Sequence, residues 1–157
     1  MVSFESKQNT AGEPTTTSID ALTLDALQKF QCRLKSKRLQ LEKELQSTTA
    51  PVSTKEISAA ICQLIENAIA QSPEGGNVNV TLIDNEHCWE LEVANSAKAH
   101  FERWGATHSA QQPGCSPETL HAVVQAANSH GGELKSLNCP LGGTANILKI
   151  PRQNQDG

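Results

Sequence analysis

The chain has 157 residues, 37% of them hydrophobic, and a formal net charge of −4 at pH 7, which suits one compact domain with an extension. The charge balance is acidic and no long basic run occurs, so we expect no binding to nucleic acid or to a membrane surface. No apolar run reaches the length of a transmembrane helix, and residues 1–18 lack the charged start and apolar stretch of a signal peptide. Together these features predict a cytoplasmic protein.

The first third of the chain is predicted to hold a disordered tail followed by one long helix. Residues 1–18 are rich in Thr, Ser, Gln and Glu, a composition that favours disorder. Residues 19–50 contain a helical pattern over 23–46, where leucines recur on one amphipathic stripe at Leu24, Leu27, Leu34, Leu41 and Leu45. The stripe fits two arrangements: a coiled-coil seam that joins two copies in a homodimer, or a helix packed on its own domain.

A second helix is predicted after a short linker at residues 47–52, which includes Pro51. Ser53-Thr54-Lys55-Glu56 is typical of a capping box, in which the Ser hydroxyl accepts a backbone N–H and the Glu carboxylate reaches back to the cap. Pro73-Glu74-Gly75-Gly76 ends this helix. Its apolar face comprises Ile57, Ile61, Leu64, Ile65, Ala68 and Ile69.

The remaining pattern predicts a β-hairpin, a third helix and two further strands. Alternating apolar residues over 78–82 and 89–93 flank a turn at 84–86, and the same alternation places Glu90 and Glu92 on the solvent side. Residues 94–115 are irregular. Ser116-Pro117 begins a helix that ends at Gly131-Gly132, and short strands follow over 134–137 and 145–150.

This order of elements predicts an α+β fold, a two-layer sandwich in which helices pack on one face of a mainly antiparallel sheet. The domain covers residues 51–152 and leaves a tail at 153–157. The long helix over 23–46 precedes this domain.

The cysteines and histidines give no independent sign of chemistry. The 5 cysteines are far apart and form no Cys-x-x-Cys pair, which favours reduced, mostly buried thiols: Cys32, Cys62, Cys88, Cys115 and Cys139. We do not expect a zinc site, and Cys115 has no marked base to make it a nucleophile. His121 and His130 are too far apart on one helix to form a metal pair, and His130 is expected to cap or pack the helix end.

Several motifs, together with the order of elements, resemble the ATPase domain of sensor histidine kinases (the GHKL group, HATPase_c) over residues 53–152. Residues 63–76 resemble the N box, a helix that runs into a Ser-Pro-x-Gly-Gly turn. His130-Gly131-Gly132 and Gly142-Gly143-Thr144 resemble the family's last helix end and the entry to its last strand, and Phe101-Glu102-Arg103-Trp104 is a weaker match to the F box. The resemblance implies a Bergerat-like fold, a role in two-component signal transduction, a signalling-protein partner, and ATP with Mg²⁺ as cofactors.

The resemblance also implies a set of site residues. Asn67 stands at the position of the Mg²⁺ ligand, where an amide oxygen suits a hard cation, and Glu66 stands at the acidic position beside it, the candidate catalytic residue. Gln63, one helical turn earlier, would form a polar wall. Asn95 would contact adenine, and Gly143 with Thr144 would form the floor of the nucleotide site.

The sequence departs from the family pattern where the phosphates should bind. Ala97 and Ala99 replace glycines of the G1 box, and Pro117 and Thr119 replace those of the G2 box; proline has no N–H to offer. Glu118 adds a negative charge at a helix N-terminus, where a triphosphate would bind.

Two further features of the family are missing from this sequence. None of the 5 histidines lies in residues 23–46, so the expected helix has no phosphoacceptor. The short linker leaves no room for the family's first strands, which predicts a trimmed sheet.

Three functions remain open at this stage. The first is a non-catalytic signalling regulator or interaction module with the histidine-kinase fold. The second is a protein that binds ATP–Mg²⁺ and phosphorylates a histidine of another protein. The third is a purely structural subunit. We favour the first, because the replaced glycines and the missing acceptor histidine argue against an active kinase and against ATP and Mg²⁺ as working cofactors.

Overall fold

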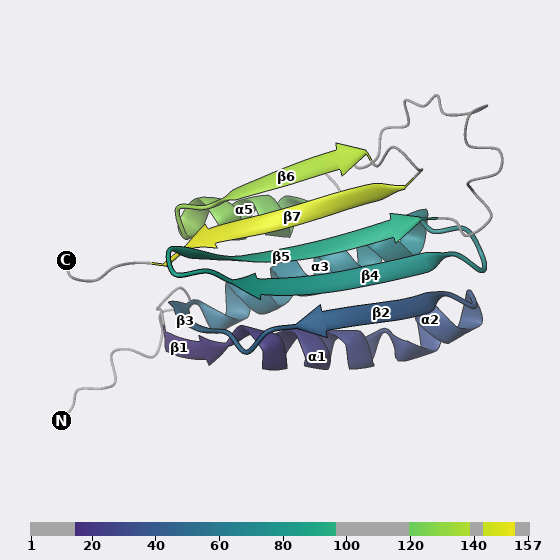
Figure 1. Ribbon diagram of the computed structural model, residues 1–157, viewed down its shortest axis with the longest axis horizontal. Helices are drawn as coiled ribbons and strands as arrows, with labels where there is room; N and C mark the ends of the chain where they lie inside the picture. Colours follow the sequence, from purple (N-terminus) through teal and green to yellow (C-terminus); the bar gives the residue numbers. More distant parts are fainter. Residues whose placement is uncertain (1–14, 97–119, 139–142, 153–157) are drawn as a thin grey trace.

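The computed structural model describes residues 15–96, 120–138 and 143–152 (Figure 1). These residues form a five-stranded sheet with helices on one face and a small two-stranded sheet beside it. In chain order the elements are β1 (Thr15–Ser18), α1 (Ile19–Lys29), α2 (Gln31–Ser36), β2 (Gln40–Leu45), β3 (Thr49–Val52), α3 (Thr54–Gln71), β4 (Asn77–Asp84), β5 (Cys88–Ser96), α5 (His121–Ser129), β6 (Glu133–Asn138) and β7 (Thr144–Pro151).

The main sheet has the strand order β2-β4-β5-β7-β6. Only the β2–β4 pair is parallel, and the other three pairs are antiparallel. The predicted hairpin is confirmed as β4 and β5, with Val80 opposite Val93. The α+β two-layer prediction and the mainly antiparallel sheet are therefore confirmed.

The hydrophobic core lies between this sheet and the helices α1, α3 and α5 (Figure 1). Burial alternates strictly along β5, as expected for a strand with one face on the core. Glu90 and Glu92 lie on the opposite face, where they are half-buried by neighbouring strands. The largest buried side chains on the sheet are Trp89, Leu82, Leu91, Leu148 and Ile150.

The long helix predicted over residues 23–46 is wrong. The helical segment ends at Ser36, and residues 40–45 form strand β2 instead. Arg38 adopts a left-handed conformation with φ of 57°, and the N–H of Leu39 donates to the carbonyl of Leu34 at 2.9 Å. These are the bonds of a Schellman ending, formed here on arginine rather than glycine.

The stripe of leucines is consequently divided between two structures. Leu27 and Leu34 are buried in the chain's own core, and α1 packs against α3. Leu41 and Leu45 lie on β2, opposite Val78 and Leu82 of β4. The helix-on-its-own-domain arrangement therefore holds for α1, and a continuous coiled-coil seam over residues 23–46 does not exist.

The structure also corrects the expected linker, tail and trimmed sheet. Residues 49–52 form β3, which pairs with β1, so residues 47–52 are not a plain linker and residues 15–18 are not part of a tail. The rest of the predicted tail lies outside the described residues. Strands β1, β2 and β3 all precede α3: β2 joins the main sheet, and β1 and β3 form the small sheet, so the chain has the early strands that the sequence was expected to lack.

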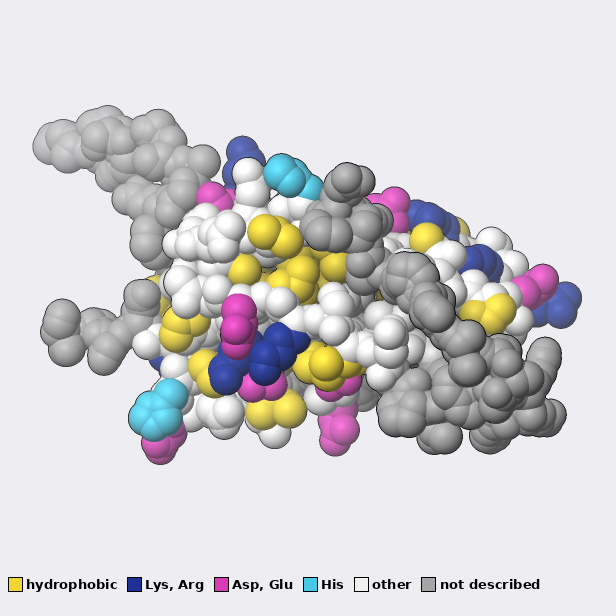
Figure 2. Space-filling model, turned by 90° about the horizontal axis from the view of Figure 1, so that it is seen from above, with side chains coloured by type: hydrophobic (Ala, Val, Ile, Leu, Met, Phe, Trp, Pro, Cys, Tyr) yellow, Lys and Arg dark blue, Asp and Glu magenta, His cyan; other side chains and the backbone are white. Residues whose placement is uncertain are grey.

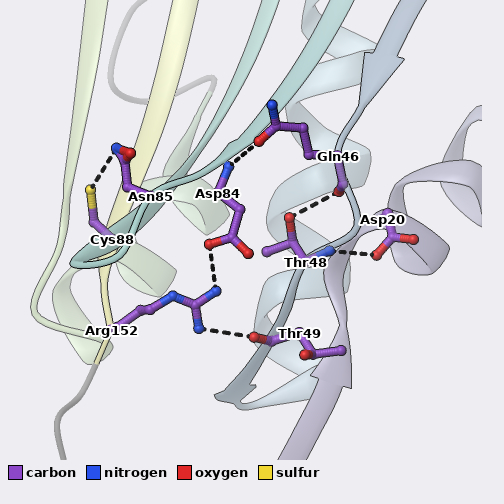
Figure 3. Close-up of polar contacts among 8 residues, drawn as sticks. All are labelled: Asp20, Gln46, Thr48, Thr49, Asp84, Asn85, Cys88 and Arg152. Atoms are coloured by element: carbon purple, nitrogen blue, oxygen red, sulfur yellow. Dashed lines mark hydrogen bonds and ion pairs between the residues drawn. The ribbon is translucent and has the colours of Figure 1, made fainter.

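Polar contacts hold the N-terminal elements to one end of the main sheet (Figure 3). Arg152 donates to a carboxylate oxygen of Asp84 at 2.7 Å and to the Thr49 carbonyl at 3.0 Å. The Asp84 N–H donates to the Gln46 side-chain oxygen at 2.8 Å. These bonds join the end of β4 and the residue after β7 to the start of β3 and to Gln46, which lies between β2 and β3.

The described cysteines are free thiols, as expected. Cys32 is exposed and Cys62 and Cys88 are only half-buried, so the prediction of mostly buried thiols is wrong for these three. In the described ranges, no helix is both long and apolar enough to cross a membrane.

Candidate functional site

Buried polar side chains gather on the inner face of the sheet where β5 ends and β7 begins. Asn95 of β5 lies directly opposite Thr144 of β7, and both are buried. Two residues further along β7, Asn146 shares the inner face and is 1% exposed. Helix α3, which packs against β5, contributes Asn67, which is buried, and Gln63, which is half-buried. We call the set Gln63, Asn67, Asn95, Thr144 and Asn146 the polar cluster. The resemblance predicted four of these five positions.

Asn67 lies on α3 and is 5% exposed. Its Oδ1 accepts a bond from Gln71 Nε2 at 3.4 Å, one helical turn further along. Its Nδ2 is buried and has no hydrogen-bond partner among the described residues. A buried amide donor without a partner lowers the stability of the fold by about 1–3 kcal/mol.

Gln63 lies one turn before Asn67 on α3 and reaches the N-terminus of α5. Its Oε1 accepts from the N–H of Ala122 at 2.7 Å and from that of Val123 at 3.3 Å. The N-cap residue of α5, Leu120, supplies no side-chain bond. Gln63 therefore acts as the cap of a helix that is about sixty residues away in sequence.

Glu66 points away from the polar cluster. Its carboxylate lies 3.6 Å from the Arg33 guanidinium, and the two side chains are 55% and 49% exposed. In this position Glu66 joins α3 to α2 at the surface. The structure thus separates the candidate catalytic carboxylate from Asn67, and its catalytic role stays a prediction.

Gly143 lies against the backbone of Asn95. It has φ of +101°, and a Cβ at this position would overlap the Asn95 carbonyl oxygen and lie 2.9 Å from Ser96 Cα. Only glycine fits this close approach. Gly143 therefore allows β7 to approach the end of β5. The place of Gly143 and Thr144 at the floor of a nucleotide site stays a prediction.

Asn146 is the member of the polar cluster that sequence reasoning missed. Its Oδ1 accepts a bond from the Ser136 hydroxyl of β6 at 2.6 Å. The available signal was an amide at an inward position of an otherwise apolar strand, which is uncommon unless the amide has a partner.

His130 links the C-terminal end of α5 to the start of α3. Its Nε2 accepts from the Ser53 N–H at 3.1 Å, and its Nδ1 lies 2.8 Å from the Ala126 carbonyl. These contacts fit the neutral ring that carries its proton on Nδ1. The expectation that His130 caps or packs the helix end is confirmed.

The capping box at the start of α3 is half confirmed. Glu56 N–H donates to the Ser53 hydroxyl at 3.3 Å, as predicted. The Glu56 carboxylate does not return to the cap but accepts from the Ser129 hydroxyl at 2.9 Å. His130 takes the Ser53 N–H in its place, because the neighbouring helix end lies within reach.

Groups that could hold a metal ion are sparse here. Across residues 15–96, 120–138 and 143–152, no three His, Cys, Asp or Glu side chains come together. Asn67, the expected Mg²⁺ ligand, accepts from Gln71, and the Ala122 and Val123 N–H groups of α5 donate to Gln63.

Other sequence predictions fall outside the described residues. They are the altered G1 and G2 positions Ala97, Ala99, Pro117, Glu118 and Thr119, the F-box match at 101–104, the start of the third helix at Ser116, and Cys115. The helix itself is present as α5, and the two strands after it are confirmed as β6 and β7.

Figure 2 shows the surface of one face of the molecule. On the described part of this face, basic and acidic side chains lie beside one another, with hydrophobic side chains between them. Charges of the two signs are therefore mixed there rather than gathered into one patch.

The arrangement of a mixed sheet with helices on one face has counterparts among solved structures. The chain has the fold of the catalytic (ATPase) domains of histidine kinases. No model of a known protein family matches its sequence, and no curated protein matches it.

Three of the similar structures illustrate the match. The nucleotide-free catalytic domain of histidine kinase ThkA has a TM-score of 0.71 at 18% identity, over 90% of this chain and 99% of that one. The mycobacterial sensor histidine kinase MprB gives 0.69 at 21% identity, over 89% and 100%. Histidine kinase AdeS of Acinetobacter baumannii gives 0.72 at 20% identity, over 96% and 72%. At these identities the likeness concerns the fold.

Proposed function

We propose that this chain is a non-catalytic signalling module with the histidine-kinase ATPase fold, which acts by binding a protein partner rather than by turning over ATP. The observation that carries the proposal is the contact made by Asn67. The side-chain amide that would bind Mg²⁺ instead bonds to the Gln71 side chain, at 3.4 Å, and no three His, Cys, Asp or Glu side chains of the described residues come together as a metal site.

The sequence around the site supports the same proposal. Alanines at positions 97 and 99 and Pro117 stand where the family pattern has glycines. Each change removes conformational freedom or a backbone donor that a triphosphate needs. The Glu66 carboxylate is engaged with Arg33 at the surface, so a general-base role for it would require this ion pair to open.

The proposed partner is a response-regulator-like signalling protein. Histidine kinase ThkA has been solved in complex with the response regulator protein TrrA, and this chain matches it with a TM-score of 0.70 at 18% identity, over 45% of that chain. A module that kept the fold and lost catalysis would retain surfaces for such partners.

Homodimerisation through residues 23–46 stays a prediction, now without a coiled-coil seam. Leu24 on α1 is 44% exposed and is the apolar side chain of that region best placed to meet a second copy. We expect Leu24→Glu to halve the mass measured by light scattering if the dimer exists. An unchanged mass would remove this surface from consideration.

One observation favours the second function, ATP–Mg²⁺ binding with phosphorylation of a histidine in trans. The Asn67 Nδ2 is buried without a partner among the described residues. A half-turn of the amide would place Oδ1 in that position and make it available to a cation. This alternative needs Asn95 to contact the base and Asn67 to hold the metal.

Thermal unfolding with and without ATP–Mg²⁺ separates the two functions. A ligand at about 100 times its Kd stabilises the folded state by about 2.7 kcal/mol, which raises Tm by about 5–10 °C in a domain of this size. We expect no such rise at millimolar ATP–Mg²⁺. A rise that disappears in Asn67→Ala would overturn the proposal and establish the alternative, and loss of phosphotransfer in Glu66→Gln would then assign the base.

A further inference from the structure

At the N-terminus of α5, the side chain of Gln63 occupies backbone N–H donors of the first helical turn. The first backbone N–H groups of a helix have no partner within the helix, and the summed peptide dipoles make this end partly positive. An anion normally binds such a terminus through these N–H groups. In this chain the oxygen of Gln63 takes that position, 2.7 Å from Ala122 N and 3.3 Å from Val123 N.

Three features indicate that this contact is a built arrangement. It joins residues 59 and 60 positions apart in sequence, so neither helix can form it alone. It orders a long side chain, which loses conformational entropy. It also replaces a local side-chain cap, because Leu120 provides no side-chain bond; the Leu120 carbonyl accepts from the N–H groups of Val123 and Val124, at 3.0 and 2.9 Å.

The neighbouring residue provides a second, independent observation. Asn67 follows Gln63 by one turn on the same side of α3, is 5% exposed, and holds a buried Nδ2 without a partner among the described residues. A buried polar atom with nothing to bind is unusual. One helical turn from Gln63 there is thus a buried amide N–H group with no hydrogen-bond partner among the described residues.

We propose that the Gln63 side chain is an internal plug that occupies the anion position at the N-terminus of α5 and closes it to phosphate. The inference deepens the proposed function and rests on it in one respect, namely that the resting domain binds no triphosphate. The neutral amide oxygen of Gln63 accepts from the same backbone N–H groups that a phosphate oxygen would use. The plug opens only when Gln63 leaves these N–H groups.

Two substitutions at Gln63 test the plug. Gln63→Met keeps the length of the side chain and removes the acceptor oxygen. Gln63→Glu keeps an acceptor of the same length and adds a negative charge, which favours a helix N-terminus. The probe is inorganic tripolyphosphate, with and without magnesium chloride, and the readout is the amide resonances of Ala122 and Val123 by NMR.

Tripolyphosphate is expected to leave both resonances in place in the wild-type chain and in Gln63→Glu, and to move them in Gln63→Met. Amide exchange at Ala122 should also be about fivefold faster in Gln63→Met, the effect of losing one helix cap. A folded Gln63→Met chain whose resonances ignore tripolyphosphate would overturn the plug. So would a wild-type chain whose Ala122 resonance already moves.

If Gln63→Met does not fold, Gln63→Glu still decides the matter. A carboxylate in the same place should hold the Ala122 amide at least as well as the natural amide, so faster exchange at Ala122 in Gln63→Glu would overturn the plug. Failure of the proposed function looks different: ATP–Mg²⁺ would move the resonances near Asn95 and Asn67 in the wild-type chain, while Ala122 and Val123 stayed in place.

Discussion

Gly143→Ala is expected to be strongly destabilising, for two reasons that can be separated. The first is conformational: Gly143 has φ of +101°, and a non-glycine residue held in such a region costs about 1–3 kcal/mol. The second is steric: the new Cβ would overlap the Asn95 carbonyl oxygen and lie 2.9 Å from Ser96 Cα. Overpacking of this kind costs about 1–3 kcal/mol.

The chain contains a matched control for the conformational part. Gly75 has φ of +83°, and a Cβ there would meet nothing within 4 Å, so Gly75→Ala pays only the cost of the unusual φ, about 1–2 kcal/mol. The expected loss for Gly143→Ala is the sum of both parts, about 2–6 kcal/mol. This is a large fraction of the total stability of a typical domain, about 5–15 kcal/mol.

The assay is urea unfolding of the two variants and the wild-type chain, followed by circular dichroism. An unchanged slope with a lower midpoint would show that stability alone has changed. Equal losses for Gly143→Ala and Gly75→Ala would refute the reasoning, because the overlap of the new Cβ with the Asn95 carbonyl would then cost no stability.

Three further outcomes follow from the polar contacts. Lys37→Met removes the ammonium that donates to the Ile69 and Ser72 carbonyls at 2.6 and 2.7 Å. It should lower the free energy of unfolding, measured in urea, by about 1–2 kcal/mol. A loss no larger than that caused by replacing an exposed lysine of α2 would contradict this. The Thr48 backbone N–H holds the pKa of Asp20 below its usual value, so this carboxylate stabilises the fold above the unfolded-state pKa, about 3.9, and the contribution is lost as pH falls through the lower folded-state value. The gap in urea midpoint between Asp20→Asn and the wild-type chain should therefore close at strongly acidic pH, and a gap independent of pH would argue against it. A double-mutant cycle of Arg152→Met and Asp84→Asn should give a coupling of about 1 kcal/mol, since the pair is 2.7 Å apart and mostly buried; additive losses would show no coupling.

Elements with strong local signals could be predicted from the sequence. The helix α3 has a capping serine and a continuous apolar face, and the β4–β5 hairpin has strict alternation on both strands. In both cases the local preference agrees with the final environment, so the pattern alone is sufficient.

Strand β2 could not be predicted in this way. Its sequence, Gln-Leu-Glu-Lys-Glu-Leu, consists of residues with good intrinsic helix propensity. Pairing with β4 overrides this preference, because the strand covers the edge of the sheet and half-buries Leu41 and Leu45. The turn that precedes it depends on Arg38 in a left-handed conformation, for which arginine gives no signal.

The sequence motifs indicated which residues to consider for the candidate site, but not the hydrogen bonds that these residues form. Family motifs indicated Asn67, Asn95 and Gly143, and the strand register then brought Asn95 beside Thr144. The bond from Gln63 to α5 depends on how two helices pack, and no local pattern encodes it. The same is true of Glu66, whose direction is set by Arg33 on a separate helix.

The position of β2 in the sheet changes how self-association of this protein should be investigated. A shortened chain that starts near residue 50 would lose the strand that covers β4 through six paired residues, and the bared backbone of β4 would offer a template for a neighbouring molecule. Such a chain would tend to gain contacts between molecules and give an artificial oligomer. Single surface substitutions, which leave every strand in place, are the sound way to ask whether two copies meet.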